Sequence, residues 1–353
     1  MKGVLQGDRV IFGTDAIPEL YETLYYGRVR GDKLELALVE AAYLLDREKI
    51  SVTADGKPLG FRELFILASQ AQELFELKYI VYRDLRERGY FVQPGVIDFR
   101  VFPRGGRPNV VPSRYFVHVI SERKPLPLAD IVGNLQAALN VRKEMVLAIV
   151  DEESDITYYG VKANVLKGQM APPDVGPVPG SATLLEDRVV VWDRSLSEAL
   201  HAQGFYGNPL DEQRLQLSLV ESAYLIMRHK LEVADRSGAP VALDTFTERA
   251  LAFEPDFKRK LLVYADLRDK GLVAKTGFKF GSSFRVYEHV ESIAKIPHSR
   301  FLVDAHGFDY VFHLQALSRS VRLANSVRKE MVFACDKDGE STVRYFSLGR
   351  IKL

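Results

Sequence analysis

The sequence NVRKEMVLA (residues 140–148) returns as SVRKEMVFA (residues 326–334), and the interval between them decides the organisation of the chain. Five further pairs precede this one in the same order: DRVIF from residue 8 and DRVVV from 187, LVEAAYLL from 38 and LVESAYLI from 219, VYRDLRERG from 81 and VYADLRDKG from 263, DFRVF from 98 and SFRVY from 283, and PSRYFV from 112 and HSRFLV from 298. A period of roughly 180 residues is too long for a solenoid and indicates a duplicated set of domains. The chain therefore consists of two homologous copies in tandem.

Each copy changes character midway. In the second copy, Leu215, Leu219, Ala223 and Ile226 recur with helical spacing and predict a buried helix face. The later part of each copy has short runs rich in Val, Phe and Tyr around a helical stretch, which predicts a mixed sheet flanked by helices. The fold class is therefore α/β and α+β. The expected subdomains are residues 1–80 and 81–166 in the first copy, and 185–260 and 261–353 in the second.

The two copies are separated by MAPPDVGPVPGS (residues 170–181), which is rich in proline and glycine. These residues interrupt helices and strand ladders, so we expect an exposed linker, taken as residues 167–184.

The composition is that of a globular protein: among 353 residues, 47% are hydrophobic and 48 Lys+Arg balance 47 Asp+Glu. No apolar run approaches ~18 residues, so we expect a cytoplasmic protein with neither a transmembrane span nor a signal peptide. The single cysteine, Cys335, lies in an apolar run and is expected to be a buried structural thiol. Because the net charge is near zero, any anionic partner must bind to a local basic patch.

A chemical role is best sought where the two copies differ, because a structural role should survive in both. Three positions gain a polar or ionisable group in the second copy: Phe102 is matched by Tyr287, Pro112 by His298, and Gln136 by Arg322. Lys143 and Lys329 are shared. His118, the one histidine of the first copy, lies in the apolar run YFVHV and is expected to pack within a strand.

The second copy thus has a tyrosine, a histidine and a lysine but no cluster of carboxylates that could bind a metal ion. This set suits RNA cleavage in which the 2′-hydroxyl attacks the neighbouring phosphate. This reaction needs a base at the 2′-oxygen, an acid for the departing 5′-oxygen, and a cation beside the phosphorane. Neither a metal nor another cofactor is required.

At these residues the chain resembles the archaeal tRNA-splicing endonucleases, in the order and spacing of FKFGSSFRVY (278–287), HSRFLV (298–303) and SVRKEMVFA (326–334). It is similar to the class in which an inactive and an active copy are fused and two chains form a homodimer. The resemblance implies a restriction-endonuclease-like mixed-sheet subdomain in each copy, with Tyr287 as general base, His298 as general acid and Lys329 as transition-state stabiliser. The substrate would be precursor tRNA with a bulge-helix-bulge, and the products a 2′,3′-cyclic phosphate and a 5′-hydroxyl.

The resemblance also implies two binding features. Arg322 and Arg344 match the arginines between which the family holds a bulge base, and guanidinium stacking on an unpaired base suits that role. The acidic run DEESD, with Asp151, Glu152, Glu153 and Asp155, matches the loop that the inactive copy docks onto the partner's active copy. Residues 275–329 hold nine Lys+Arg against four Asp+Glu, which would complement such a loop.

Two other functions remain open. A non-catalytic RNA-binding or scaffolding subunit would not need the ionisable set of the second copy. A metal-dependent nuclease would need converging carboxylates near Lys329, and Glu330 and Asp336 form no such pattern. His306 and His313 have no assigned role, and their spacing is not that of a metal site.

Overall fold

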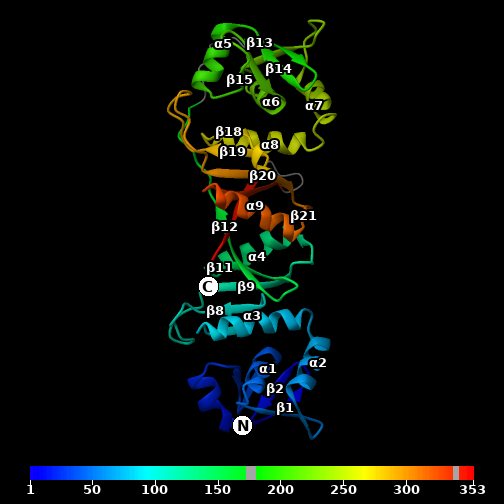
Figure 1. Cartoon of the computed structure of the whole chain (residues 1–353), viewed down its shortest axis with the longest axis vertical. Coiled ribbons are helices and arrows are strands. Elements are labelled where there is room, and N and C mark those ends of the chain that lie inside the picture. The colour runs from blue at the N-terminus through cyan, green and yellow to red at the C-terminus, as the bar shows by residue number, and fades with distance from the viewer. Residues whose placement is uncertain (172–179, 337–341) are drawn as a thin grey trace. The chain divides into compact units, whose positions relative to one another are not determined.

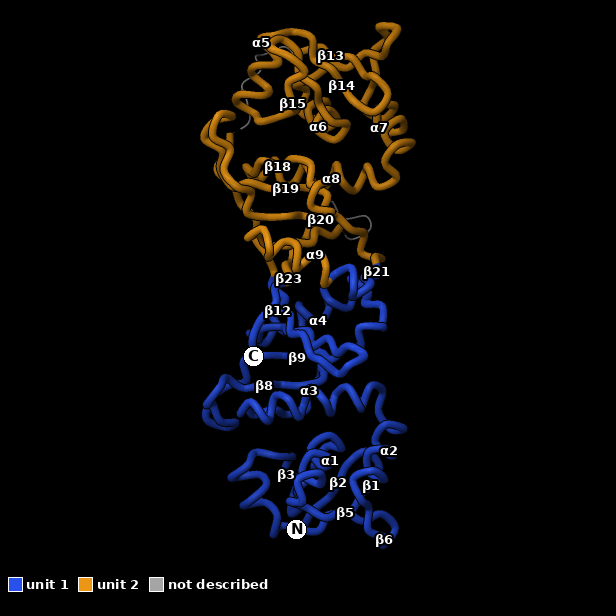
Figure 2. The backbone as a smooth tube through the Cα atoms, in the orientation of Figure 1, with its two compact units in different colours: residues 1–162, 311–317, 349–353 blue, residues 163–310, 318–348 orange. Residues whose placement is uncertain are grey.

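A computed structural model describes residues 1–171, 180–336 and 342–353. The chain divides into two compact units (Figure 2), which correspond largely to the two copies. Unit 1 comprises Met1–Lys162, Val311–Leu317 and Gly349–Leu353, and unit 2 comprises Ala163–Tyr310 and Ser318–Leu348. Each unit has its own hydrophobic core, as expected of two domain sets in tandem.

Unit 1 begins with a six-stranded sheet in the order β3-β4-β2-β1-β5-β6. Its strands are β1 (Lys2–Gln6), β2 (Arg9–Phe12), β3 (Arg28–Arg30), β4 (Lys33–Ala37), β5 (Ser51–Ala54) and β6 (Lys57–Leu59). The helical segments are η1 (Thr14–Ala16), η2 (Ile17–Thr23), α1 (Leu38–Asp46), α2 (Phe61–Ala71) and α3 (Phe75–Glu87). Helix α3 contacts both α1 and the next sheet, so it joins the two layers of this unit.

The second sheet of unit 1 has the order β12-β11-β9-β8-β7. Its strands are β7 (Val92–Pro94), β8 (Phe99–Val101), β9 (Tyr115–Ser121), β11 (Glu144–Val150) and β12 (Ile156–Asn164). Strands β9 and β11 are parallel and are connected through α4 (Leu128–Asn140), whereas the other pairs are antiparallel. A short strand β10 (Leu126–Pro127) pairs with β21 (Val311–Phe312), which the second copy contributes to this unit.

Unit 2 repeats this plan. Its first sheet has the order β15-β16-β14-β13-β17. The elements are β13 (Gly180–Leu185), β14 (Arg188–Val191), α5 (Arg194–Glu198), η3 (Ala199–Gln203), β15 (Asn208–Pro209), β16 (Leu215–Ser218), α6 (Leu219–Met227), β17 (Leu231–Ala234), α7 (Leu243–Leu251) and α8 (Phe257–Asp269). Helix α8 contacts α6 on one side and β18 (Val273–Thr276) and β20 (Phe301–Gly307) on the other, as α3 contacts α1 and the second sheet in unit 1 (Figure 1).

The second sheet of unit 2 has the order β18-β19-β20-β22-β23. The elements are β18 (Val273–Thr276), η4 (Phe278–Phe280), β19 (Phe284–Tyr287), β20 (Phe301–Gly307), β22 (Glu330–Asp336) and β23 (Val343–Arg350). Strands β20 and β22 are parallel, and α9 (Leu314–Ser326) lies between them in the sequence. The mixed sheet with a connecting helix is the architecture predicted for the later part of each copy.

Three details differ from the sequence-based expectations. Leu215 is not in the predicted helix but begins β16, because Ser218 caps α6 and accepts a hydrogen bond from the backbone N–H of Glu221. The expected boundaries at residues 80/81 and 260/261 fall inside α3 and α8, the helices shared by two layers. Strand β13 starts at Gly180, within the expected linker 167–184, of which residues 172–179 lie outside the described part of the chain.

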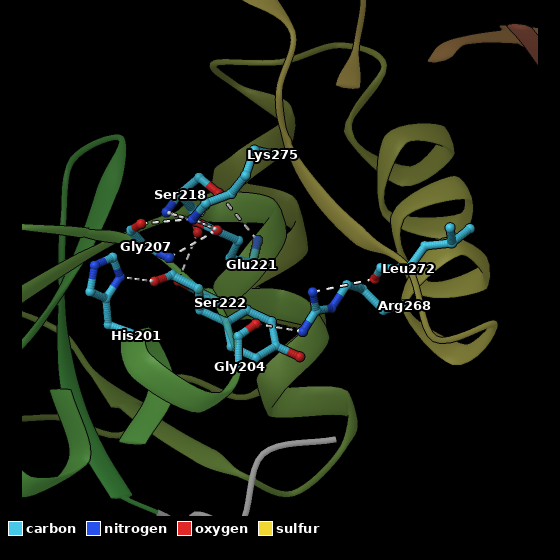
Figure 3. Close-up of polar contacts among 10 residues, drawn as sticks. His201, Gly204, Gly207, Ser218, Glu221, Ser222, Arg268, Leu272 and Lys275 are labelled. Carbon is cyan, nitrogen blue, oxygen red and sulfur yellow. Dashed lines mark hydrogen bonds and ion pairs between the residues drawn. The ribbon is translucent and has the colours of Figure 1, made fainter. Parts of the chain in front are cut away.

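A buried carboxylate joins the two layers of unit 2 (Figure 3). Glu221 accepts hydrogen bonds from the backbone N–H groups of Gly207 (2.9 Å) and Ser218 (3.0 Å), and Lys275 of β18 contacts it at 3.2 Å. Burial opposes ionisation, but Lys275 and the hydrogen bonds outweigh it and lower the pKa of Glu221. In unit 1, burial raises the pKa of the corresponding Glu40, which receives two backbone hydrogen bonds but, among the described residues, no contact from a lysine.

Candidate active site

Three adjacent strands of unit 2 bring the candidate catalytic residues to one end of the sheet. The backbone N–H of Arg300 donates to the carbonyl of Val286 (3.1 Å), and the N–H of Glu330 donates to the carbonyl of Arg300 (3.0 Å). These bonds extend the β19–β20 and β20–β22 registers by one residue. Tyr287 and Lys329 therefore lie in one row, on either side of Arg300, and His298 precedes this row on the central segment.

Tyr287 is held by apolar packing. Its side chain belongs to a small buried cluster with Phe205, Val273 and Val290, and only 6% of the residue is exposed. Within the described residues, its hydroxyl makes no hydrogen bond. Packing thus holds the ring, and the hydroxyl is not engaged by another described residue.

Lys329 is tied to the segment that carries His298. Its Nζ donates to the carbonyl oxygen of Ser299 at 2.7 Å and lies 5.6 Å from the centre of the Phe280 ring. Burial, followed by the nearby charge of Arg285, lowers the pKa of Lys329. His298 is exposed, whereas Ser299 beside it is buried. The hydrogen bond therefore places the ammonium group one residue from the imidazole.

The first copy retains this frame without the hydroxyl and the imidazole. The N–H of Arg114 donates to the carbonyl of Val101 (2.9 Å), and the N–H of Glu144 donates to Arg114 (2.9 Å). Lys143 donates to the carbonyl of Ser113, as Lys329 does to Ser299. The corresponding row, however, begins with Phe102, and Pro112 stands in place of His298. Both copies therefore share the frame, and the hydroxyl and the imidazole occur in the second copy alone.

Glu288 and Arg300 form an ion pair beside Tyr287 that the comparison of the two copies does not predict. Glu288 directly follows Tyr287, and its carboxylate accepts two hydrogen bonds from Arg300 Nη1, at 2.7 and 2.9 Å. In the first copy, Arg114 pairs instead with Glu144 of the neighbouring strand. The sequence does show that the copies differ at this position, because Glu288 follows Tyr287 where Pro103 follows Phe102. It does not show that the Glu288 carboxylate binds Arg300, because a charged residue in a loop can pair with many neighbours.

The candidate RNA-binding arginines are both exposed in unit 2. Arg322 lies on α9, and Arg344 lies on β23 opposite Cys335. Cys335 is fully buried, and burial raises the pKa of its thiol to about 11, so the prediction of a structural thiol agrees with its surroundings.

The acidic run forms a tight turn between β11 and β12. Asp151 accepts hydrogen bonds from the backbone N–H groups of Glu153 (3.0 Å) and Asp155 (2.8 Å), so its carboxylate shapes the turn. Glu152 forms an ion pair with Arg123. The carboxylates of Glu153 and Asp155 have no partner within residues 1–171, 180–336 and 342–353, and both residues are exposed.

The unassigned histidines have structural surroundings. His306 stacks on Tyr310 with ring centres 3.9 Å apart and pairs with Asp304 at 3.0 Å. The carbonyl of His313 accepts the first hydrogen bonds of α9. In the first copy, His118 packs in β9 and pairs with Asp98 at 2.8 Å. Across the described residues, no group of three or more His, Cys, Asp or Glu is arranged to hold a metal ion.

Helices in the part of the chain that the structure describes are too short or too polar to cross a membrane.

Two family models each match the chain twice. The model described as "tRNA intron endonuclease, N-terminal domain" matches residues 1–65 and 180–247, and the model described as "tRNA intron endonuclease, catalytic C-terminal domain" matches residues 75–158 and 257–345.

Curated relatives match over the whole chain. A tRNA-splicing endonuclease of Methanococcoides burtonii is 54% identical over 353 residues, covering 100% of both chains. That of Methanosarcina mazei is 53% identical and covers 100% of this chain and 99% of its own. That of Halobacterium salinarum is 40% identical over 369 aligned positions, covering 99% of each. The duplicated domains, matched in order by both family models, and these full-length relatives show that the chain belongs to the tRNA intron endonuclease family.

Proposed function

We propose that this protein removes introns from precursor tRNA by cutting the RNA at bulge-helix-bulge sites without a metal ion. The observation that carries the proposal is the row formed by Tyr287, Arg300 and Lys329, with His298 beside it, on a frame that the first copy shares but leaves chemically inert. Membership of the tRNA intron endonuclease family supports the choice of substrate.

The three side chains match the three needs of the reaction. Tyr287 accepts or orients the proton of the 2′-hydroxyl, whose oxygen forms a bond to the adjacent phosphorus. The bond from phosphorus to the 5′-oxygen breaks, and His298 donates the proton that this oxygen needs. Lys329 stabilises the extra negative charge of the phosphorane. The products are a 2′,3′-cyclic phosphate and a 5′-hydroxyl.

Arg322 and Arg344 hold the RNA in this proposal. Both side chains are exposed on the unit that carries the catalytic row. A planar guanidinium stacks on an unpaired base, and each stacked base contributes about 1–3 kcal/mol to binding. Bulged nucleotides offer such faces, whereas paired ones do not.

The active form is proposed to be a homodimer in which the acidic turn of one chain docks onto the basic second copy of its partner. Asp151 shapes the turn and Glu152 is engaged by Arg123, which leaves Glu153 and Asp155 as the carboxylates that meet the partner. Charge complementarity of this kind fixes orientation between partners.

The test is single-turnover cleavage of an intron-containing precursor tRNA in excess chelator, with analysis of the RNA ends. We expect cyclic phosphate and 5′-hydroxyl ends, and a rate loss of at least about 100-fold for His298→Ala and for Tyr287→Phe. Pro112→Ala, the matched change in the first copy, should leave the rate within a few-fold of wild type. Loss of cleavage in chelator, or a 3′-hydroxyl product, would refute the mechanism. Binding without cleavage would instead indicate a scaffolding subunit.

A further inference from the structure

The start of the segment between the copies is bound to the loop that follows Tyr287. We call residues 167–170 the strap. The backbone N–H of Gly168 donates to the carbonyl of Lys270, and that of Met170 donates to Gly271, both at 2.9 Å. The N–H of Gln169 points the other way and donates to the carbonyl of Glu288 at 3.0 Å. The strap therefore bridges the turn before β18 and the residue directly after Tyr287.

The side chain of Met170 extends this contact to the apolar cluster around the tyrosine. Met170 packs against the cluster that contains Tyr287, Phe205 and Val290. Its sulfur also accepts a hydrogen bond from the backbone N–H of Val290 at 3.5 Å. Glu288 is thus held at its carbonyl by the strap and at its carboxylate by Arg300, which follows His298 by two residues.

The strap lies so close to the turn that only glycine fits at position 168. A Cβ on Gly168 would stand 1.9 Å from the carbonyl oxygen of Gly271, whereas real Cβ atoms keep at least about 3.0 Å. Gly271 itself has φ +75°. In the first copy, Gly89 has the same left-handed conformation, φ +85°, and a Cβ there would meet nothing within 4 Å. Within the described residues, therefore, nothing lies over the turn at Gly89 as closely as the strap lies over Gly271.

We infer that the strap is a positioning element for the reaction, which holds Tyr287 in the geometry that cleavage requires. The inference rests on the proposed function, because it assigns to Tyr287 a direct role in catalysis. It goes beyond that function, because it assigns the start of the segment between the copies a role in positioning a catalytic residue, in addition to its role as a linker.

Gly168→Ala is the sharpest test. Gly168 does not have a left-handed φ, so alanine adds no backbone strain of its own, and its effect comes from the contact with Gly271. Relief of that contact needs a shift of about 1 Å, and displacements of this size lower catalytic rates by about 10- to 100-fold. We expect a loss of this size in single-turnover cleavage at saturating enzyme, with the dissociation constant for precursor tRNA unchanged. Gly133→Ala, where a Cβ meets nothing within 4 Å, is the control and should retain the wild-type rate.

A double-mutant cycle separates positioning from general stability. If the strap acts through Tyr287, Gly168→Ala should slow the Tyr287→Phe enzyme by less than about 3-fold, because the group it positions has already been removed. Met170→Ala should show the same coupling, and Met170→Leu should restore most of the rate, because leucine refills the apolar cluster.

A wild-type rate in Gly168→Ala and in Met170→Ala would overturn the inference, as would a full multiplicative loss in the Tyr287→Phe background. Wild-type cleavage in chelator is measured alongside the variants. If wild type fails to yield cyclic phosphate ends, the proposed function fails. If wild type yields them and the strap variants are unaffected, the strap inference alone fails.

Discussion

Replacement of Lys143 and Lys329 by methionine should separate the structural and chemical parts of one shared contact. Each lysine donates to a backbone carbonyl in an equivalent position, Ser113 in the first copy and Ser299 in the second. Methionine keeps the apolar stem and removes the ammonium group. A hydrogen bond from a charged donor contributes about 1.5–3 kcal/mol, so both variants should lose a similar amount of stability. A thermal melt of each purified variant measures this common part.

The chemical part belongs to Lys329 alone. A rate loss of at least 100-fold corresponds to about 2.7 kcal/mol of lost transition-state stabilisation. Single-turnover cleavage at saturating enzyme should therefore fall by at least about 100-fold in Lys329→Met, while Lys143→Met stays within about 3-fold of wild type. Equal losses of rate in the two variants would refute the reasoning, because they would mean that Lys329 acts only by holding the Ser299 carbonyl.

In Lys275→Gln, buried Glu221 loses its cation, and the free energy of unfolding at pH 7 should fall by about 3 kcal/mol. The pKa of Glu221 is lower in the folded protein than its value of ~4.3 in the unfolded chain, so ionised Glu221 stabilises the fold above about pH 4.3. The difference in the free energy of unfolding between the variant and wild type should therefore become smaller as the pH falls below about 4.3. Chemical unfolding at pH 7 and at pH 4 measures this difference. Glu153→Gln with Asp155→Asn should weaken dimerisation at low salt, as measured by analytical ultracentrifugation, and an unchanged dimer would exclude docking through this turn. Arg322→Lys should raise the dissociation constant for precursor tRNA nearly as much as Arg322→Ala, since lysine lacks the stacking plane, and full binding by the lysine variant would indicate simple charge attraction.

The sequence was sufficient to predict the tandem repeat and the mixed sheets, because each copy serves as a reference for the other. Lys143 and Lys329 were recognised as shared, and their equivalent carbonyl contacts agree with a common structural part. The difference between Phe102 and Tyr287 indicates a candidate site at the end of β19, where the row of Tyr287, Arg300 and Lys329 begins. The assignment of Tyr287, His298 and Lys329 to steps of the reaction stays a prediction that the proposed experiments test.

Contacts between distant backbone segments could not be predicted. Gly168 and Gly271 are separated by a whole subdomain, and no residue pattern indicates that their backbones meet. The start of α6 was misplaced because Leu215 continues the helical spacing into β16, and the Ser218 cap overrides that spacing. Periodicity reports which residues are buried, whereas caps and close glycine contacts report where the chain turns.

Unit 1 includes residues from the end of the chain, and this affects when it can finish folding during translation. Phe312 pairs with Leu126, and the N–H of Ile351 donates to the carbonyl of Tyr158 at 2.9 Å, so residues of the second copy complete the first. A ribosome that has just made Lys162 has about 190 residues still to add, which takes roughly 10–40 s at about 5–20 residues per second. During that interval the first unit lacks its last strand partners. Its folding therefore finishes after translation of the second copy, even though almost all of its own sequence was made first.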